Sequence, residues 1–468
     1  MFRRSRFAWI FLGLALFAGL VAFACSDDEG DTPSDGTPSD TTAEATIDDA
    51  TPTPYTGVII NPEDVLEKDG NASKTAELKI GWMFEASGPP EVTGFGVPTG
   101  DGVKLAVEEI NEAGGFQVGN TVYTIKLIEY DTKSTEQDTI ANTQALVSDD
   151  GVKVIFGPAT LGETSATTIT QEAEVIHLCP CQEREKHALS SVEKAHGESQ
   201  WAFQTLLPFS LLVEQGASTF STEWPDLHSM AFLCQNSATG KDICERTRDA
   251  YEAHGVEIIG DIQYFTVGTT DYRPFLTALK NQGEIDYLYN YDNPLNTVQI
   301  VRQAFELGVG KLHLVTVPAA LVQPLIGREI PQDTAVSAGA APRQGVQPTS
   351  QKAADYFERY AEFKGMTFDE LAGSVPANFV SLMTYDYLYM VAAAMQQAGT
   401  VDDTSAIAKK LEVLHYNGVA EDDLFFNSRH LAVHGTEPCV VRDDPASSDL
   451  AMQEITCTHN LAPPQAAK

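Results

Sequence analysis

Cysteine is the side chain with the widest chemistry in this chain of 468 residues, which contains seven of them. One stands near the N-terminus and the other six occur as three sets. The positions are Cys25; Cys179 and Cys181; Cys234 and Cys244; and Cys439 and Cys457. An even number after the first is typical of disulfides in exported proteins. We predict a hairpin disulfide Cys439–Cys457 first and Cys234–Cys244 second, and leave open the partners of Cys179 and Cys181, which are too close in sequence to pair readily.

The remaining reactive side chains form no pattern of an enzyme or a metal protein. No Cys-x-x-Cys pair occurs, which argues against zinc. His430 and His434 have a metal-compatible spacing, with His459 further on, but such a pair without a carboxylate or a helix is usually structural. The sequence has no HExxH motif, phosphate-binding loop or nucleophile elbow. We therefore predict no metal, no cofactor and no catalytic activity.

The N-terminus has the pattern of an export signal. Arg3, Arg4 and Arg6 precede an apolar run from residue 7 to residue 24, which is also long enough to span a membrane. Ala22-Phe23-Ala24-Cys25 is similar to a bacterial lipobox, in which the cysteine is acylated and becomes the new N-terminus. An ordinary signal or an uncleaved anchor is the alternative. In each case the chain that follows lies outside the cytoplasmic membrane, and acylation of Cys25 would attach it there.

Residues 25–76 read as an acidic, disordered linker. This stretch is rich in Asp, Thr, Ser, Pro and Gly and has few apolar residues to bury. The whole chain carries 66 acidic and 30 basic residues, a formal net charge of −36. Such a surface repels nucleic acids and anionic lipids, so neither is predicted as a partner.

Strand and helix patterns alternate through the rest of the chain, which predicts parallel sheets with helices on both faces. The first series has strands at 78–84, 121–131, 152–158 and 175–180, and helices at 100–115, 135–149 and 164–174. After residues 201–209 the pattern restarts. The second series has strands at 229–235, 256–265, 286–291 and 311–317, and helices that begin near residues 240, 271, 295 and 319.

The last part of the chain returns to helices before a β-like tail. Residues 334–342 read as a connecting strand, followed by helices at 350–364, 377–397 and 403–414 and by strand patterns from residue 416. About 390 residues after the linker are too many for one core. We predict an α/β fold of two doubly wound parallel-sheet lobes joined by a multi-strand hinge. Residues 1–24 are the signal, 77–205 with 337–416 form lobe 1, and 206–336 with 417–468 form lobe 2.

The segment 78–116 resembles the opening of the branched-chain amino acid (Leu/Ile/Val) binding proteins of ABC transporters, which have the type I periplasmic-binding-protein fold. The resemblance rests on Ser87-Gly88-Pro89, Ala106-Val107, Ile110-Asn111 and Gly114-Gly115. Further similar stretches are "IEYDTKS", "IFGPATLGETSATT" and "IDYLYNYDNPLNTVQIVRQAFELGV", so the likeness extends from residue 76 to about residue 427. It implies a two-lobed solute receptor that closes about a hinge.

The resemblance implies that loops at the carboxyl ends of the strands line the cleft, where helix N-termini also point. In the loop matching residues 87–95, relatives supply an aromatic contact, so Ser87 and Phe95 are candidates here. In the loop matching residues 158–164, relatives grip the ligand carboxylate with hydroxyl and backbone N–H groups. Thr160, Leu161 and Gly162 take those places, with Leu161 where relatives have serine.

Three further segments complete the implied site. Cys181, Gln182 and Glu183 stand where relatives bind the amino acid with backbone groups and a threonine, and Thr239 replaces a tyrosine. The last candidates are Asp292, Asn293 and Thr316; Thr316 lies where relatives have a glutamate that pairs with the ligand ammonium. An unpaired ammonium in a closed cleft is costly. An α-amino acid is therefore disfavoured unless Glu183 or Asp292 compensates, and an amide, a carboxylate or an aromatic acid becomes a serious option.

The function implied is that of a solute-binding lipoprotein of an ABC importer, with a small solute and the permease subunits as partners. The alternative is an extracellular sensing lipoprotein that passes its signal to a membrane receptor.

Overall fold

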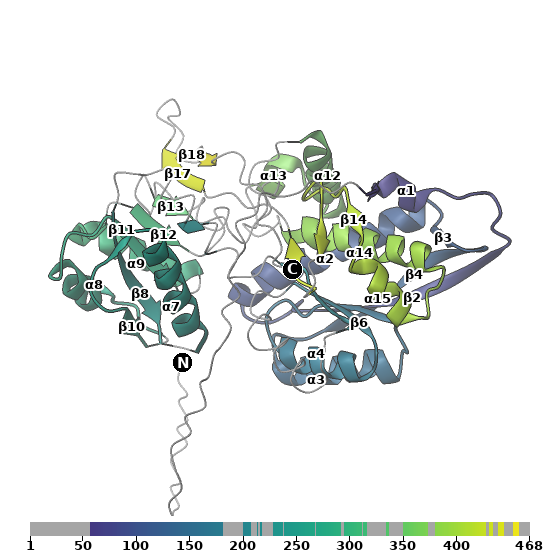
Figure 1. Cartoon of the computed structure of the whole chain (residues 1–468), viewed down its shortest axis with the longest axis horizontal. Helices are drawn as coiled ribbons and strands as arrows, with labels where there is room; N and C mark the ends of the chain where they lie inside the picture. Colours follow the sequence, from purple (N-terminus) through teal and green to yellow (C-terminus); the bar gives the residue numbers. More distant parts are fainter. Residues whose placement is uncertain are drawn as a thin grey trace, which may run out of the picture. The chain divides into compact units, whose positions relative to one another are not determined.

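A computed structural model of the protein contains two units, each built on a mixed sheet in which most strands are parallel (Figure 1). The residues it describes are 57–180, 200–206, 213, 216–217, 228–236, 238–266, 268–291, 294–310, 312–315, 334–336, 350–372, 380–426, 430–433, 439–443 and 453–457. The predicted signal, Cys25 and the predicted linker up to residue 56 lie outside these residues. Residues 57–76, which the sequence assigned to the disordered linker, instead contain β1 (Ile59–Ile60), α1 (Pro62–Leu66) and the first residues of β2. No helix among the described residues is long and apolar enough to cross a membrane.

The first unit is built on a sheet of six strands in the order β3-β4-β2-β5-β6-β7. The strands are β2 (Lys74–Phe84), β3 (Phe116–Val118), β4 (Thr121–Asp131), β5 (Val154–Phe156), β6 (Ile176–Cys179) and β7 (Ala202–Gln204). All neighbours are parallel except β3, which runs antiparallel to β4. The alternating pattern of the sequence predicted four of these strands, β2, β4, β5 and β6, whereas β3 and β7 were not predicted.

Eight helices belong to the described part of this unit. They are α1 (Pro62–Leu66), α2 (Pro90–Glu112), α3 (Glu136–Ser148), α4 (Glu163–Glu172), α12 (Gln351–Phe363), α13 (Phe368–Ala372), α14 (Val380–Ala398) and α15 (Thr404–Leu411). Helix α2 begins ten residues before the helix predicted at 100–115, so Phe95 lies on a helix and not in a loop. Pro90 suits the first helical position because its fixed φ matches the helix and its missing N–H needs no partner there.

Helices α2 and α14 pack against each other in the core of the first unit. Thr384 of α14 donates a hydrogen bond to the backbone oxygen of Thr99 in α2, at 2.5 Å. Gly102 allows this close approach, because a Cβ atom there would lie 2.0 Å from the backbone oxygen of Ser381. Nearly all of α14 is buried, in keeping with its apolar sequence.

The second unit is built on a sheet with the order β10-β8-β11-β12-β13-β17-β18. Its strands are β8 (Ser229–Gln235), β9 (Glu257–Ile258), β10 (Gln263–Phe265), β11 (Tyr287–Tyr291), β12 (Leu312–Val315), β13 (Thr334–Val336), β17 (Cys439–Asp443) and β18 (Gln453–Cys457). Its described helices are α7 (Ala238–Ala253), α8 (Arg273–Lys280) and α9 (Pro294–Leu307). The strand predicted at 256–265 is divided into β9 and β10, which both pair with β8, because Gly260 adopts a φ of +69° between them.

Residues 415–426 and 430–433 pack with the first unit. Strand β14 (His415–Tyr416) pairs with β1 (Ile59–Ile60), and β15 (Phe425–Phe426) pairs with β16 (Ala432–Val433). The ring of Phe426 lies 4.9 Å from that of Phe203, which belongs to β7. The hairpin of β17 and β18, by contrast, extends the second sheet through β13.

Candidate functional site

The carboxyl ends of strands β4, β2 and β5 bring two carboxylates and two loops together. These strands are adjacent and parallel, so their ends share one edge of the first sheet. Glu85 directly follows β2, and Asp131 is the last residue of β4. The loop after β5 contains the candidates Thr160, Leu161 and Gly162. This edge is therefore the part of the predicted site that the structure describes best.

Glu85 is completely buried, and its carboxylate holds the loop after β5. Its Oε1 accepts hydrogen bonds from the backbone N–H of Thr160 at 2.8 Å, the hydroxyl of Thr160 at 2.8 Å and the backbone N–H of Leu161 at 3.2 Å. Its Oε2 accepts one from the backbone N–H of Ala159 at 3.2 Å. Four donors that converge on one side chain suit a carboxylate, which only accepts.

Asp131 holds the loop after β2 in the same manner. Its carboxylate accepts hydrogen bonds from the hydroxyl of Ser87 at 2.6 Å and from the backbone N–H groups of Ala86 and Ser87, each at 3.1 Å. The backbone N–H of Lys133 donates a fourth, at 2.8 Å. Burial acts to raise the pKa of Asp131, but the hydrogen bonds from Ser87, Lys133 and Ala86 outweigh it, so the pKa lies below its ordinary value.

The five described candidates of the first unit follow strands β2 and β5 in the sequence, and these two strands end at this edge. The side chain of Leu161 is 39% exposed, which leaves an apolar group accessible beside the buried Glu85. Gly162 adopts a φ of +79° at the start of α4, a conformation that favours glycine. Phe95 is half-buried and packs against the core, while Ser87 is exposed. Ligand contact by these residues stays a prediction.

Most candidates of the other segments lie outside the described residues. These are Cys181, Gln182, Glu183, Asp292, Asn293 and Thr316. Thr239 falls within the first turn of α7, directly beyond the carboxyl end of β8. Its place in the chain agrees with the predicted segment, although its side chain is not among those described.

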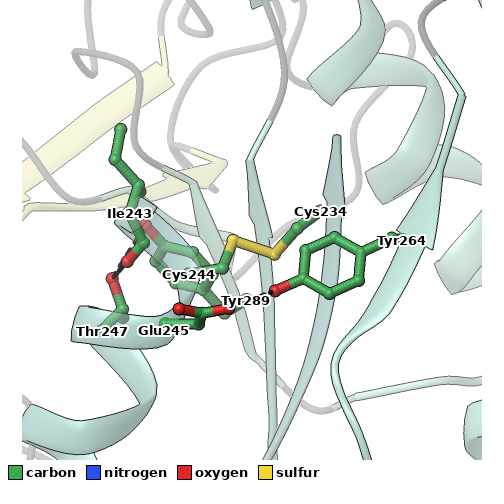
Figure 2. Close-up of a disulfide and its surroundings, with 7 residues drawn as sticks. All are labelled: Cys234, Ile243, Cys244, Glu245, Thr247, Tyr264 and Tyr289. Carbon is green, nitrogen blue, oxygen red and sulfur yellow. Dashed lines mark hydrogen bonds between the residues drawn. A yellow bond between two sulfur atoms is a disulfide. The ribbon is translucent and has the colours of Figure 1, made fainter. Parts of the chain in front are cut away.

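The disulfide predicted between Cys234 and Cys244 is confirmed. Figure 2 shows the sulfur–sulfur bond that joins strand β8 to helix α7. Thr239, in the first turn of α7, lies between the two cysteines in the sequence. Beside it, Tyr264 donates a hydrogen bond to Glu245 at 3.4 Å, and Thr247 donates one to Tyr289 at 3.2 Å. The disulfide thus fixes the start of α7 relative to the carboxyl end of β8 in the second sheet.

The other cysteines are only partly described. Cys179, at the end of β6, is disulfide-bonded, and its partner lies outside the described residues. Strand pairing places Cys439 directly opposite Cys457 in the hairpin of β17 and β18. This register is compatible with the predicted disulfide, which stays a prediction.

Of the histidines considered as metal ligands, His430 is engaged in structural contacts, whereas His434 and His459 lie outside the described residues. His430 stacks on Phe203 with ring centroids 4.1 Å apart, and its ring nitrogens lie 3.0 Å from a carboxylate oxygen of Glu412 and 3.2 Å from the backbone oxygen of Ala202. Among the described residues, no group of three or more His, Cys, Asp or Glu side chains could hold a metal ion.

Asp131 of this edge was not among the site residues predicted from the sequence, and neither was Glu85. Glu85 ends the run "WMFE", in which an acidic residue directly follows an apolar strand. A carboxylate at the end of a buried parallel strand lies where ligands bind in this class of sheet, and that position could have drawn attention to it.

Comparisons with known proteins now identify the class. A family model described as "Periplasmic binding protein" matches residues 77–443. The Leu/Ile/Val-binding protein homolog 3 of Brucella melitensis is 24% identical over 344 residues, which cover 72% of this chain and 83% of that protein. The substrate-binding protein LivJ of Streptococcus pneumoniae, solved in complex with isoleucine, is 20% identical with a TM-score of 0.60 and covers 82% of this chain and 100% of that one. A solute-binding protein of Rhodopseudomonas palustris, solved with 3,4-dihydroxybenzoic acid, is 16% identical with a TM-score of 0.59 and covers 79% and 94%.

The structural likenesses show the α/β fold of type I periplasmic binding proteins, as the sequence predicted. The family match spans well over half of the chain, and the protein therefore belongs to the periplasmic binding protein family. Members of this family are extracytoplasmic solute binders without enzymatic activity, in agreement with the predictions drawn from the sequence.

Proposed function

We propose that this protein is the solute-binding component of a branched-chain-amino-acid-type ABC importer. It would capture a small polar solute in the cleft between its two lobes and deliver it to the permease subunits. The match of one family model to residues 77–443, which span both sheet units, carries this proposal. Closure of the lobes about the hinge would bury the solute and signal occupancy to the permease.

The test is a thermal-shift screen of the full chain against amino acids, amides, short carboxylates and aromatic acids. A solute that binds only the folded protein increases the free energy of unfolding by mass action, by about 2.7 kcal/mol at a solute concentration of a hundred times Kd. The melting temperature rises as a consequence. A saturable increase confirmed by calorimetry would support the proposal. Turnover of the bound solute would contradict it.

The class of solute is open in the family, because one structural neighbour was solved with isoleucine and another with 3,4-dihydroxybenzoic acid. Thr316 stands where the resemblance leads us to expect a glutamate for an ammonium group. We infer that Glu183 compensates if the solute is an amino acid. In that case Glu183→Ala weakens binding by about 1–3 kcal/mol, whereas unchanged affinity would remove Glu183 from the site.

A further inference from the structure

We propose that Glu85 and Asp131 make the carboxyl edge of the first sheet an acceptor surface, which takes a hydrogen-bond donor of the solute and rejects a carboxylate. The solute group facing Ser87 and Thr160 would then be an amide, an ammonium or a hydroxyl. This inference rests on the proposed function, because it names the class of solute that the same edge selects.

The backbone donors of the loop after β5 are already used by the protein itself. A backbone N–H carries a single proton and makes one strong hydrogen bond. The N–H groups of Ala159, Thr160 and Leu161 all donate to the carboxylate of Glu85, at 3.2, 2.8 and 3.2 Å. A solute carboxylate could bind to these three groups only by displacing Glu85.

The two hydroxyls at this edge are committed in the same way. A serine or threonine hydroxyl has one proton to donate and two lone pairs that accept. Thr160 donates its proton to Glu85 at 2.8 Å, and Ser87 donates its proton to Asp131 at 2.6 Å. Each hydroxyl therefore offers only lone pairs to a solute, and a group with N–H or O–H complements them.

The charges at this edge also disfavour an anion. A solute carboxylate would approach two carboxylates of the same sign in a partly buried place, where repulsion is strong. Lys133 follows Asp131 in the sequence, but its ammonium group pairs with Asp138 at 3.0 Å. An amide or hydroxyl avoids the repulsion, and an ammonium gains attraction.

Glu85 is held in place and cannot readily turn aside. Gly96 of α2 lies against it, and a Cβ atom at Gly96 would come within 2.8 Å of the Cβ of Glu85 and 2.9 Å of its Oε2. With the helix on one side and the loop on the other, the carboxylate is a fixed part of the edge.

The first experiment removes the carboxylate and supplies one in solution. In Glu85→Ala the three N–H groups are free, and acetate can take the place of the missing carboxylate. We expect acetate to raise the melting temperature of this full-length variant by about 2 °C or more over equal concentrations of acetamide and of chloride. Wild type should show no such difference. An equal response to acetate and acetamide would overturn the proposal, whether or not a natural solute is known.

The second experiment measures selectivity with isosteric pairs in which the carboxylate or the amide is the only polar group, namely benzoate and benzamide, and isovalerate and isovaleramide. In wild type the amide of a pair should bind about tenfold more tightly or better, and Glu85→Ala should raise the carboxylate-to-amide affinity ratio at least about tenfold. If Glu85→Ala does not fold, Glu85→Gln removes the charge and replaces one acceptor oxygen by an NH2 group, which frees a backbone N–H of the loop, and it should raise the ratio about threefold or more. A wild-type preference for the carboxylates, or a ratio that neither variant changes, would overturn the proposal while leaving the proposed function intact.

Asp286→Asn is the matched control. Asp286 is buried and accepts hydrogen bonds from the backbone N–H of His228 at 2.8 Å and from the backbone N–H and hydroxyl of Ser229 at 3.2 and 3.1 Å. It lies at the amino ends of β8 and β11, opposite to the edge where solutes bind, so its variant should keep the wild-type ratio. Absence of binding by wild type to every solute of the broader screen would instead count against the proposed function.

Discussion

At the scale of single residues, this protein uses carboxylates that are buried (Glu85 and Asp386) or half-buried (Asp131) to hold its loops. Glu85 accepts four hydrogen bonds from residues 159–161, and Asp131 accepts four from residues 86, 87 and 133. Asp386 of α14 similarly accepts hydrogen bonds from the backbone N–H groups of Val419 and Ala420, at 2.9 and 2.7 Å. Because each carboxylate serves donors from another part of the chain, it links segments that are far apart in sequence.

Asp386 should make the stability depend on pH. Burial raises its pKa to about 7, against the opposing hydrogen bonds from Ala420 and Val419. Between about pH 4 and pH 7 the folded protein thus keeps a proton that the unfolded chain releases. The stabilisation from this bound proton is full at low pH, decreases as pH rises and is lost once pH has risen through 7. We expect the loss of this stabilisation to lower the free energy of unfolding by about 2–4 kcal/mol between pH 5 and pH 8.

Urea unfolding of wild type and Asp386→Asn at both pH values measures this effect. The neutral amide cannot titrate, so the variant should lack that part of the pH dependence, whatever its absolute stability. Asp138→Asn is the control, because the hydrogen bonds to Lys133 and Thr135 lower the pKa of Asp138 and keep it ionised at both pH values. An identical pH dependence in wild type and Asp386→Asn would refute the assignment.

At the scale of elements, the first unit depends on the close crossing of α2 and α14. Gly102→Ala should destabilise the protein by about 3 kcal/mol or more, because the added methyl group would lie 2.0 Å from the backbone oxygen of Ser381 and the helices would have to separate. Gly94→Ala is a matched substitution in the same helix with no atom within 4 Å, and it should stabilise by about 0.5–1 kcal/mol. Chemical denaturation of both variants tests the contrast, and similar effects at the two sites would contradict it.

The disulfide between β8 and α7 should contribute both to stability and to the placement of the first turn of α7, which contains Thr239. It closes a loop of ten residues in sequence separation, for which chain entropy predicts about 2–3 kcal/mol. The free energy of unfolding of the double variant Cys234→Ala/Cys244→Ala should therefore be lower by that amount, and the variant should unfold at a lower denaturant concentration. Reduction of wild type with dithiothreitol should have a comparable effect and should leave the double variant unaffected.

At the scale of the whole molecule, the chain visits each sheet unit more than once. It builds the first sheet, builds six strands of the second, returns for helices α12 to α15 and ends in the second sheet with β17 and β18. Because residues 415–426 and 430–433 pack with the first unit, we infer that the last crossing lies between residues 433 and 439, further along than the boundary predicted at residue 416.

Attachment to the membrane is a property of the whole chain that Cys25 should control. If Cys25 is acylated, Cys25→Ala should abolish lipid attachment while leaving solute affinity unchanged, since the linker separates it from the folded units. Fractionation of cells with detergent-phase partitioning and mass spectrometry of the N-terminus would measure this. Attachment of a correctly cleaved Cys25→Ala variant would contradict the lipobox interpretation.

The sequence by itself determined those features that depend on nearby residues. Strands β4 and β8 have the bounds predicted from their β-branched and aromatic runs, because such runs bounded by turns favour extended backbone locally. The disulfide Cys234–Cys244 joins residues only ten apart. The order of strands and helices likewise sufficed for the fold class, since alternating strands and helices have few ways to bury their apolar faces.

Only the tertiary structure decided the features that depend on distant partners. The sequence did not predict that Glu85 would accept hydrogen bonds from Thr160, because the two residues are 75 positions apart and meet only at the shared edge of β2 and β5. Likewise the sequence did not predict that α2 starts at Pro90 and continues through Pro98, because a proline inside a helix is locally unfavourable. It is tolerated here, where the helix packs on β2 and α14. In both cases long-range contacts offset the local preferences that sequence patterns report.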